Sequence, residues 1–398
     1  MPESYTPATS RPRAARRTAG IVAATLLTGV VGGGVAWAAT GHDLPVLRGV
    51  EIVIGDSRVQ GVADSLVEDL GFPAALVHLR DVDGSVDVAA GTGDLATGAA
   101  APVDGEVRVA SNTKTFTATV VLQLVEEGAV DLDAPIATYL PGLVHGEGID
   151  GDVITVRQLL QHTSGLPEYT ALTDPDPFAS RDVYFQPRDL TDLAFAQPAL
   201  FAPGTDWSYS NTNYVVLGML IERVTGRPFA EQVTERIIEP LDLEHTYVPA
   251  PGERTIRGEH PRGYHPAEDG ELTDITDMDP SIGGAAGVMV STPSELTEFL
   301  TALIGGELLE PAELAAMKEL VAMPEGYPGD GYGLGLIRTT LSCGEVLWGH
   351  GGTIQGAGTR GGVTEDGRGV TLATTTVPLT PEDMTAVGDK VDELICAS

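Results

Sequence analysis

The order of the patterned segments along the chain constrains the fold most. Two β-patterned runs surround an Asp-Gly dipeptide within residues 74–93, which predicts a β-hairpin. Residues 131–282 show short helical patterns joined by Pro- and Gly-rich loops, and β patterns resume after them. We therefore expect an α/β (α+β) domain built from residues 39–130 and 283–398, with a helical domain over 131–282 inserted into it.

Several helices carry clear boundary signals. Residues 214–224 are apolar at helical spacing, and Gly226 is placed to end that helix. Another helix is expected to begin at Pro293, with Thr292 as its N-cap. A terminal helix is expected over 381–395.

Residues 1–38 carry the pattern of a signal peptide. A cluster of arginines precedes an apolar run over 19–35, and Ala36-Trp37-Ala38 then forms an A-x-A cleavage signal. We expect a secreted chain that starts near Ala39. The alternative is an uncleaved membrane anchor, for which an apolar run of 17 residues is at the short limit. In both cases the rest of the chain lies outside the cytoplasm.

The two cysteines, Cys343 and Cys396, fit an extracellular location. An even number of cysteines in an exported protein predicts one disulfide. Neither cysteine has CxxC spacing or a nearby histidine pattern, so we expect neither a metal site nor thiol catalysis.

The chain is strongly acidic. Its formal net charge of −34 argues against nucleic acids, anionic membrane surfaces and acidic polymers as partners. A solvated acidic surface is the simpler interpretation of this charge. We expect no nucleic-acid partner and no membrane contact beyond export.

Lysine is rare in this chain, and one lysine has an unusual position. Of 23 basic residues only three are lysine, and Lys114 lies one helical turn after Ser111 at the start of an apolar helix. Serine needs a base to become a nucleophile, and a buried lysine can lose its proton whereas arginine cannot. Residues three apart share a helix face, so Ser111 and Lys114 are a candidate catalytic pair. Taken alone, S-x-x-K fits a helix cap with a solvated lysine equally well.

Two further motifs change that balance. The sequence Tyr209-Ser210-Asn211 lies in a loop before a helix, and His350-Gly351-Gly352 follows an apolar strand. Separately, they would indicate a helix cap and a turn at the end of a strand. In this order after S-x-x-K, they resemble the signatures S-x-x-K, Y-x-N and K/H-x-G of the serine penicillin-recognising enzymes.

The resemblance extends over most of the expected mature chain. The segments "LLQHTSGLPEY", "PGTDWSYSNTNYVVLG" and "YGLGL" are similar to segments typical of this family, which includes class C β-lactamases, DD-peptidases and related esterases. The histidine in the third motif and the cysteine pair around it resemble the secreted D-alanyl-D-alanine carboxypeptidases of actinomycetes most. The implied fold is a mainly antiparallel sheet flanked by helices with an inserted all-helical domain, and the implied site lies between them.

The resemblance assigns roles to the first two motifs. Ser111 is implied as the nucleophile, and Lys114 and Tyr209 as the proton-transfer network, with Tyr209 as the acid to the leaving group. Asn211 is implied to orient Lys114 and an amide of the substrate. No metal or cofactor is required.

The resemblance also assigns the substrate-binding groups. The backbone N–H groups of Ser111 and Thr353 would form the oxyanion hole, and Gly352 belongs to the same substrate-binding strand. His350 would offer charge or a hydrogen bond to a substrate carboxylate, helped by Arg338.

Some residues depart from the family pattern and leave the substrate open. The middle residue of the third motif, often Thr or Ser in relatives, is Gly351, and the preceding strand reads Ile337-Arg338, so that only Arg338 is available to bind a carboxylate. Ile282 stands where relatives have a tryptophan that shapes the cleft. His162 is expected to hold the "HTSG" turn, and the alternative is a catalytic base.

These features predict a serine hydrolase that acts through an acyl-enzyme. The first hypothesis is a D-Ala-D-Ala carboxypeptidase that acts on the stem peptides of peptidoglycan and is inhibited by β-lactams. The second is another hydrolase of small acyl substrates on the same scaffold: a β-lactamase, an esterase or a D-amino-acid amidase. The third is a non-catalytic sensor or binder of muropeptides.

Overall fold

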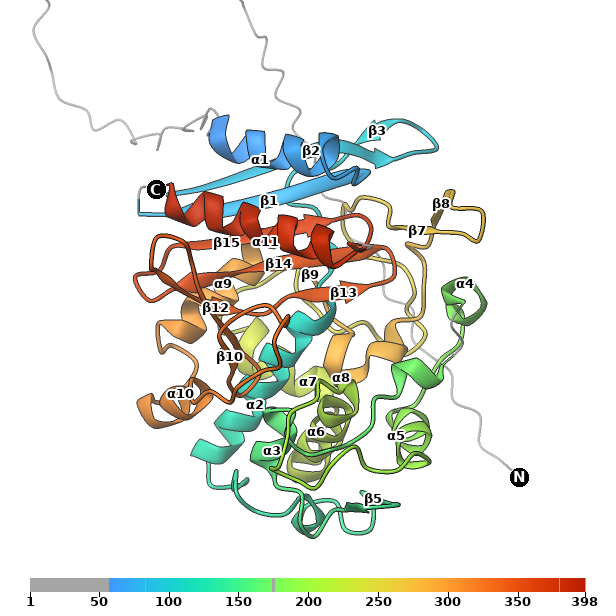
Figure 1. The fold of residues 1–398 in the computed structure, drawn as a ribbon, viewed down its shortest axis with the longest axis vertical. Helices are drawn as coiled ribbons and strands as arrows, with labels where there is room; N and C mark the ends of the chain where they lie inside the picture. The colour runs from blue at the N-terminus through green and yellow to red at the C-terminus, as the bar shows by residue number, and fades with distance from the viewer. Residues whose placement is uncertain (1–56, 83, 174–175, 379, 398) are drawn as a thin grey trace, which may run out of the picture. The chain divides into compact units, whose positions relative to one another are not determined.

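An antiparallel sheet organises the described part of the chain, residues 57–397 without 83, 174–175 and 379, in this computed structural model (Figure 1). The signal peptide predicted over 1–38 lies outside the described residues. Within them, nine strands form the sheet in the order β10-β11-β12-β14-β15-β1-β2-β3, and β13 pairs with β14. The strands are β1 (Ala74–Asp81), β2 (Gly84–Asp94), β3 (Ala99–Ala100), β10 (Gly331–Tyr332), β11 (Ile337–Thr340), β12 (Val346–Gly349), β13 (Gly352–Ile354), β14 (Ala357–Thr364) and β15 (Gly369–Thr374).

The two ends of the chain meet in this sheet. Strands β1 and β2 form the predicted hairpin, with Asp81 opposite Gly84. On its other side β1 pairs with β15, with Ala75 opposite Thr374. Segments separated by almost the whole chain therefore lie side by side, as the β-helix-β order of the sequence predicted.

Helices cover both faces of the sheet. Helices α1 (Ser57–Glu68) and α11 (Pro381–Cys396) share one apolar cluster with alternate residues of β1 and β15, and Figure 1 shows them lying over these strands. Helices α2 (Thr113–Glu126) and α9 (Pro293–Ile304) belong to the larger cluster on the other face. Because side chains alternate along a strand, β1 serves both clusters.

The segment between the two groups of strands is mainly helical, with small two-stranded sheets that the sequence analysis did not predict. The remaining α-helices are α3 (Val156–Leu160), α4 (Pro177–Ser180), α5 (Pro187–Phe195), α6 (Asn211–Thr225), α7 (Phe229–Val233), α8 (Gly284–Gly287) and α10 (Pro311–Met317). The short turns of helix are η1 (Ala110–Asn112), η2 (Ile136–Thr138), η3 (Thr170–Leu172), η4 (Thr234–Ile238) and η5 (Pro280–Gly283). The small sheets pair β4 (Val107–Arg108) with β9 (Val290–Ser291), β5 (His145–Gly146) with β6 (Ile149–Asp150), and β7 (Tyr264–Pro266) with β8 (Leu272–Asp274).

The predicted helix end at Gly226 and the predicted cap at Thr292 are confirmed, whereas α6 begins at Asn211, earlier than the expected residue 214. Gly226 ends α6 with a φ of 67°, a left-handed conformation that glycine adopts without steric cost. Thr292 caps α9 by accepting a hydrogen bond from the backbone N–H of Glu295. At α11, Thr380 and Asp383 form a capping box.

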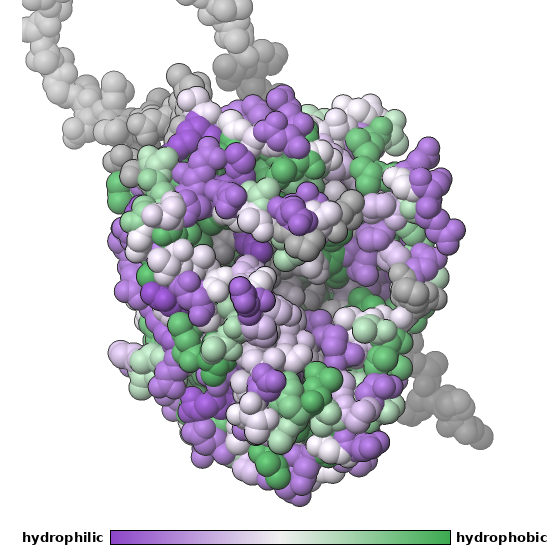
Figure 2. All heavy atoms as spheres, viewed as in Figure 1, coloured by the Kyte–Doolittle hydropathy of each residue, from purple (hydrophilic) through white to green (hydrophobic). Residues whose placement is uncertain are grey.

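The fold class is confirmed as a mixed α/β fold with an antiparallel sheet. The division into 39–130 with 283–398 and an inserted 131–282 stays a prediction. None of the described helices is long and apolar enough to cross a membrane. Hydrophilic residues are spread over the face shown in Figure 2, in keeping with the acidic composition.

The predicted disulfide is present. Cys343, in the turn after β11, is bonded to Cys396, the last residue of α11. The bond fixes the end of α11 to the strand region that leads into the His350 motif.

Reduction of this disulfide should destabilise the protein. The bond closes a loop with a sequence separation of 53, so the chain-entropy relation gives a loss of about 4 kcal/mol in the free energy of unfolding. Urea unfolding of the oxidised protein beside a Cys343→Ser/Cys396→Ser double variant measures this loss. Free thiols in the denatured, unreduced protein would contradict the pairing.

Candidate active site

Ser111 lies at the entrance of a buried helix. It occupies the middle of the 3₁₀ turn η1, directly before α2. The preceding Ala110 has a φ of 47°, a left-handed conformation that a residue with a side chain adopts only at an energetic cost. This turn presents the half-buried Ser111 to a cavity of about 210 Å³.

The Lys114 amine is buried and fully hydrogen-bonded. Its side chain is 0% exposed. Nζ donates to Ser111 Oγ at 3.0 Å, to Asn211 Oδ1 at 2.7 Å and to the Ala286 backbone oxygen at 2.8 Å. Three acceptors satisfy the three donors of an ammonium, and a neutral amine could instead accept the proton of Ser111.

Burial allows the neutral form of the Lys114 amine to be populated near physiological pH. Desolvation lowers the pKa of Lys114 to about 7, and the Glu168 carboxylate opposes this shift through its charge. The hydrogen-bond partners of Nζ among the described residues are a hydroxyl, an amide and a carbonyl, so none of them carries a negative charge. Lys114 can therefore act as a general base toward Ser111.

Tyr209 lies beside this pair with its proton retained. Lys114 Nζ is 4.9 Å from the centroid of the Tyr209 ring. Burial first, and then the neighbouring Tyr332, raise the pKa of Tyr209 well above its ordinary value, while a hydrogen bond with Ser111 lowers it. A tyrosine that keeps its proton at neutral pH can donate it to a leaving group.

Asn211 is held by a carboxylate that the sequence analysis did not single out. Asn211 is the first residue of α6, and its backbone N–H donates to Glu168 Oε2 at 2.6 Å. Glu168 therefore fixes the start of α6, from which the Asn211 side chain reaches Lys114. Its one sequence signal was its place in the "LPEY" segment.

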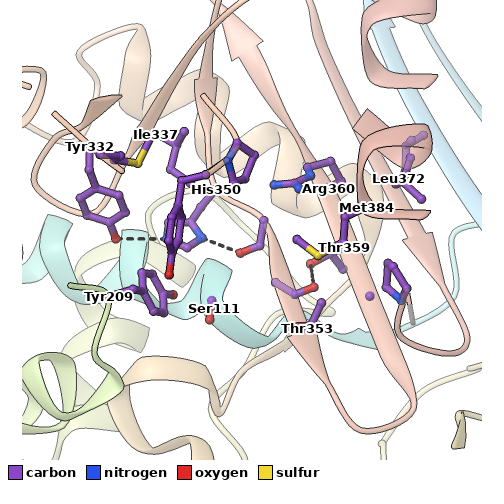
Figure 3. A pocket seen from close by; sticks show the side chains of 18 of the residues that line it. Ser111, Tyr209, Tyr332, Ile337, His350, Thr353, Thr359, Arg360, Leu372 and Met384 are labelled. Carbon is purple, nitrogen blue, oxygen red and sulfur yellow. Dashed lines mark hydrogen bonds between the residues drawn. The ribbon is translucent and has the colours of Figure 1, made fainter. Parts of the chain in front are cut away.

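A chain of hydrogen bonds passes behind Tyr209. The backbone N–H of Ser210 donates to His162 Nδ1 at 3.2 Å. His162 Nε2 lies 3.2 Å from the Tyr332 hydroxyl, which lies 3.1 Å from His350 Nε2. His350 Nδ1 then donates to the Gly351 backbone oxygen. Figure 3 shows the Tyr332–His350 part of this chain.

A backbone donor at one end, Ser210 N–H, and a backbone acceptor at the other, the Gly351 oxygen, assign every proton in the chain. Burial, followed by the charge of Lys114, holds the pKa of His162 well below its ordinary value and lowers that of His350 to about 3. Both imidazoles are therefore neutral at pH 7. His162 must carry its proton on Nε2, because Nδ1 accepts from a backbone N–H, and the hydroxyl of Tyr332 then donates to His350. The expectation that His162 holds the "HTSG" turn fits this geometry.

The expected carboxylate contact of His350 is not what the structure shows. Its ring is neutral, and both of its nitrogens are engaged, one by Tyr332 and one by the Gly351 backbone oxygen. His350 consequently offers neither charge nor a free hydrogen bond to a substrate. Its place in the structure is that of a positioning residue.

Arg338 also departs from its expected role. It pairs across the sheet with Trp348, and its guanidinium donates to Asp330 Oδ2 at 2.9 Å. Its neighbour Ile337 lines the cavity instead. Because successive side chains on a strand point to opposite faces, Arg338 points away from Ser111. The structure therefore does not place Arg338 at the cavity, where the expected carboxylate contact would be made.

Strand β13 lies against the nucleophile as expected. A Cβ atom built on Gly352 would lie 3.0 Å from the backbone nitrogen of Ser111 and 2.4 Å from the Val109 oxygen, so only glycine fits. Thr353 follows in the same strand and lines the cavity. The structure thus brings together the two backbone segments that were expected to form an oxyanion hole.

The cavity opens between these motifs, the sheet and α11. Figure 3 shows Ser111 and Tyr209 on one side of it, and His350, Arg360 and Met384 around the remainder. Among the described residues, no group of three His, Cys, Asp or Glu side chains is placed to hold a metal ion. The other lining residues include Trp207, Tyr327, Tyr332, Ile337, Gly351, Thr353, Thr359, Leu372 and Val387.

This geometry, a serine beside a buried amine and a protonated tyrosine, is that of a serine hydrolase. The chain matches the Beta-lactamase family over residues 59–391 and belongs to that family. The family expected from the three motifs is thereby confirmed.

The chain is similar in sequence and fold to solved amidohydrolase and amidase structures. It is 40% identical to a solved D-stereospecific amidohydrolase from Streptomyces sp., with a TM-score of 0.74 over 80% of this chain and 94% of that one. It is 29% identical to the D-amino acid amidase of Ochrobactrum anthropi SV3, with a TM-score of 0.76 over 86% of this chain and 97% of that one.

Curated relatives match over shorter stretches. Penicillin-binding protein 4 of Amycolatopsis lactamdurans is 29% identical over 65% of this chain and 68% of that protein. Protein flp of Staphylococcus aureus is 31% identical over 35% of this chain, and the match spans 27% of that protein.

Lys114→Arg should be nearly as inactive as Lys114→Ala. Arginine keeps the charge but cannot give up its proton, and its guanidinium is larger than the amine between the three acceptors. The rate of acylation by a fluorescent penicillin should fall about 100-fold or more in both variants, the usual scale for general acid–base catalysis. Circular dichroism reports whether the variants fold. An arginine variant that acylates within a few-fold of wild type would reduce Lys114 to an electrostatic role.

Acylation should depend on pH through Lys114. Its pKa is lowered to about 7, and the active form is the deprotonated amine. The second-order acylation rate should therefore rise about tenfold per pH unit below pH 7 and level off above it. His350, with a pKa of about 3, stays neutral over this range. Stopped-flow acylation between about pH 5 and pH 9 measures the profile, and a flat profile would show that Lys114 is not the base.

Proposed function

We propose that this chain is a serine amidohydrolase that cleaves bonds formed by D-amino acids through an acyl-enzyme on Ser111. The observation that carries the proposal is the 3.0 Å contact between Ser111 Oγ and a lysine amine whose pKa is lowered to about 7. A nucleophile with its base in place, beside a protonated Tyr209, is arranged for acyl transfer.

The groups at the site allow a balanced reaction. Lys114 takes the proton of Ser111 as Oγ attacks the carbonyl carbon, and the backbone N–H groups of Ser111 and Thr353 stabilise the oxyanion. Tyr209 gives its proton to the leaving nitrogen as the C–N bond breaks, and the Lys114 ammonium returns a proton to Tyr209. Water then attacks the ester, and the same groups work in reverse to release the acid and free Ser111.

The first candidate substrate is a peptide that ends in D-Ala-D-Ala, such as a stem peptide of peptidoglycan. The similarity to penicillin-binding protein 4 of Amycolatopsis lactamdurans supports acylation by β-lactams, and the carboxypeptidase activity rests on the resemblance of the three motifs. We further propose that the chain is exported. The N-terminal signal pattern and the disulfide between Cys343 and Cys396 support this location.

The second candidate is hydrolysis of D-amino-acid amides. A specific observation favours it, namely the 40% identity to a D-stereospecific amidohydrolase over nearly all of that chain. The two candidates share the acyl-enzyme chemistry and differ in the leaving group, which is an amino acid with a free carboxylate in the first and ammonia or an amine in the second.

One panel of substrates separates these candidates. Diacetyl-Lys-D-Ala-D-Ala, D-phenylalanine amide, a chromogenic cephalosporin and a p-nitrophenyl ester are compared by kcat/KM, with the L-isomers of the peptide and amide as matched controls. We expect hydrolysis of the D-isomers only, with the carboxypeptidase substrate preferred. Dominant turnover of the cephalosporin or the ester would reassign the enzyme to a β-lactamase or an esterase.

Ser111→Ala is the control for the chemistry. Penicillin should add one acyl group to the peptide that contains Ser111, and the alanine variant should lack this adduct. The fold should survive, because the Ser111 hydroxyl caps no helix and the loss of its hydrogen bond with Lys114 costs about 1 kcal/mol. Wild-type protein that binds muropeptides but turns over no substrate would support the non-catalytic sensor instead.

A further inference from the structure

The cation of Arg360 lines the cavity and has no partner in the described part of the chain. Arg360 lies on β14, opposite Leu372 of β15, and both side chains line the cavity that contains Ser111. In the described part of the chain, no residue makes a hydrogen bond or an ion pair with the Arg360 guanidinium. Figure 3 shows this group extending from β14 toward the side of the cavity on which His350 lies.

Gly351 leaves the space that the guanidinium uses. A Cβ atom built on Gly351 would lie 2.7 Å from Arg360 Nη1 and 3.3 Å from Cζ. A side chain at position 351 would therefore push the guanidinium aside. The observed position of the Arg360 guanidinium therefore depends on the absence of a side chain at Gly351.

Among the residues that the structure describes, no carboxylate compensates the charge of Arg360. Burial lowers its pKa, and no acidic side chain contributes an opposing shift. After burial and the charge of Lys114, the positive charge of Arg360 also contributes to the lowered pKa of His350. The neighbouring groove is lined by Asp389 and Asp392, but neither pairs with Arg360, and Asp392 accepts hydrogen bonds from Ser342. A half-buried guanidinium with free donors is suited to bind an anion.

The position of Arg360 indicates whether it would contact the acyl half or the leaving half of a substrate. Tyr209, the expected acid to the leaving nitrogen, has its ring 6.2 Å from that of His350, and Gly351 follows His350 directly. The leaving half therefore lies on the His350–Gly351 side of Ser111. That is the side toward which the guanidinium extends.

We propose that Arg360 binds the free carboxylate of the leaving amino acid, in place of Arg338. This assignment rests on the proposed function and makes it specific: Arg360 selects peptides with a C-terminal carboxylate over the corresponding amides. Arg338 provides a matched control, because it is also an arginine on this sheet but is paired with Asp330 outside the cavity.

The test compares diacetyl-Lys-D-Ala-D-Ala with its C-terminal amide. Arg360→Gln should lower kcat/KM for the free acid about 10- to 100-fold, the scale of a lost charged hydrogen bond, and leave the amide within about threefold. Arg360→Lys should recover part of the loss because it restores the charge without the fork. Arg338→Gln should change neither substrate by more than about twofold.

A binding measurement keeps the inference separate from the proposed function. In the Ser111→Ala background, calorimetry with N-acetyl-D-Ala-D-Ala and its amide measures recognition without turnover. Arg360→Gln should remove the preference for the acid there as well. Equal losses for acid and amide, no loss for either, or a selective loss in Arg338→Gln would each overturn the assignment. Absence of turnover and of a penicillin adduct in the wild type would instead refute the proposed chemistry, whatever the binding result.

Discussion

The burial of one lysine amine is the interaction on which the site depends. Lys114 has no solvent exposure and no anionic hydrogen-bond partner among the described residues, so its ammonium form is disfavoured. Because desolvation of the ammonium form costs free energy, Lys114 can serve as a base at neutral pH. Its three acceptors come from η1, the start of α6 and α8, so the amine also fixes the relative positions of three segments.

The fold creates this environment by burying α2 on nearly every side. Eleven of its 14 residues are buried, among them four threonines and one lysine, residue types that a surface helix would expose. Thr115 and Thr117 hydrogen-bond to the backbone oxygens of Gly335 and Ala285, and these bonds satisfy polar groups that have no access to water. The sheet on one side of α2 and the central helices on the other together exclude water from it.

The parts of the site that the sequence predicted are those whose geometry is local. Ser111 and Lys114 are one helical turn apart, so their contact follows from helical spacing, although their catalytic role was indicated only together with the Tyr209 and His350 motifs. The left-handed φ of Gly226 likewise follows from its place after a helix. The face on which an arginine lies depends on strand register, and a shift of one residue reverses it. The strand sequence "IRTT" has no apolar alternation that would show which of its side chains face the cavity. The sequence therefore indicated Arg338 as the carboxylate-binding arginine and gave no signal for Arg360. Glu168 and Tyr332 contact residues that are distant in the sequence, Asn211 and His350, so no local spacing indicated their roles.

The hydrogen-bond chain through His162, Tyr332 and His350 has a consequence for how the site works. It begins at a backbone N–H that cannot give up its proton and ends at a backbone oxygen that cannot keep one. No proton can therefore travel along it, although all its members are titratable side chains. It braces the Tyr209 loop against Gly351, which lies between β12 and β13, so it holds two walls of the cavity together without moving a proton between them.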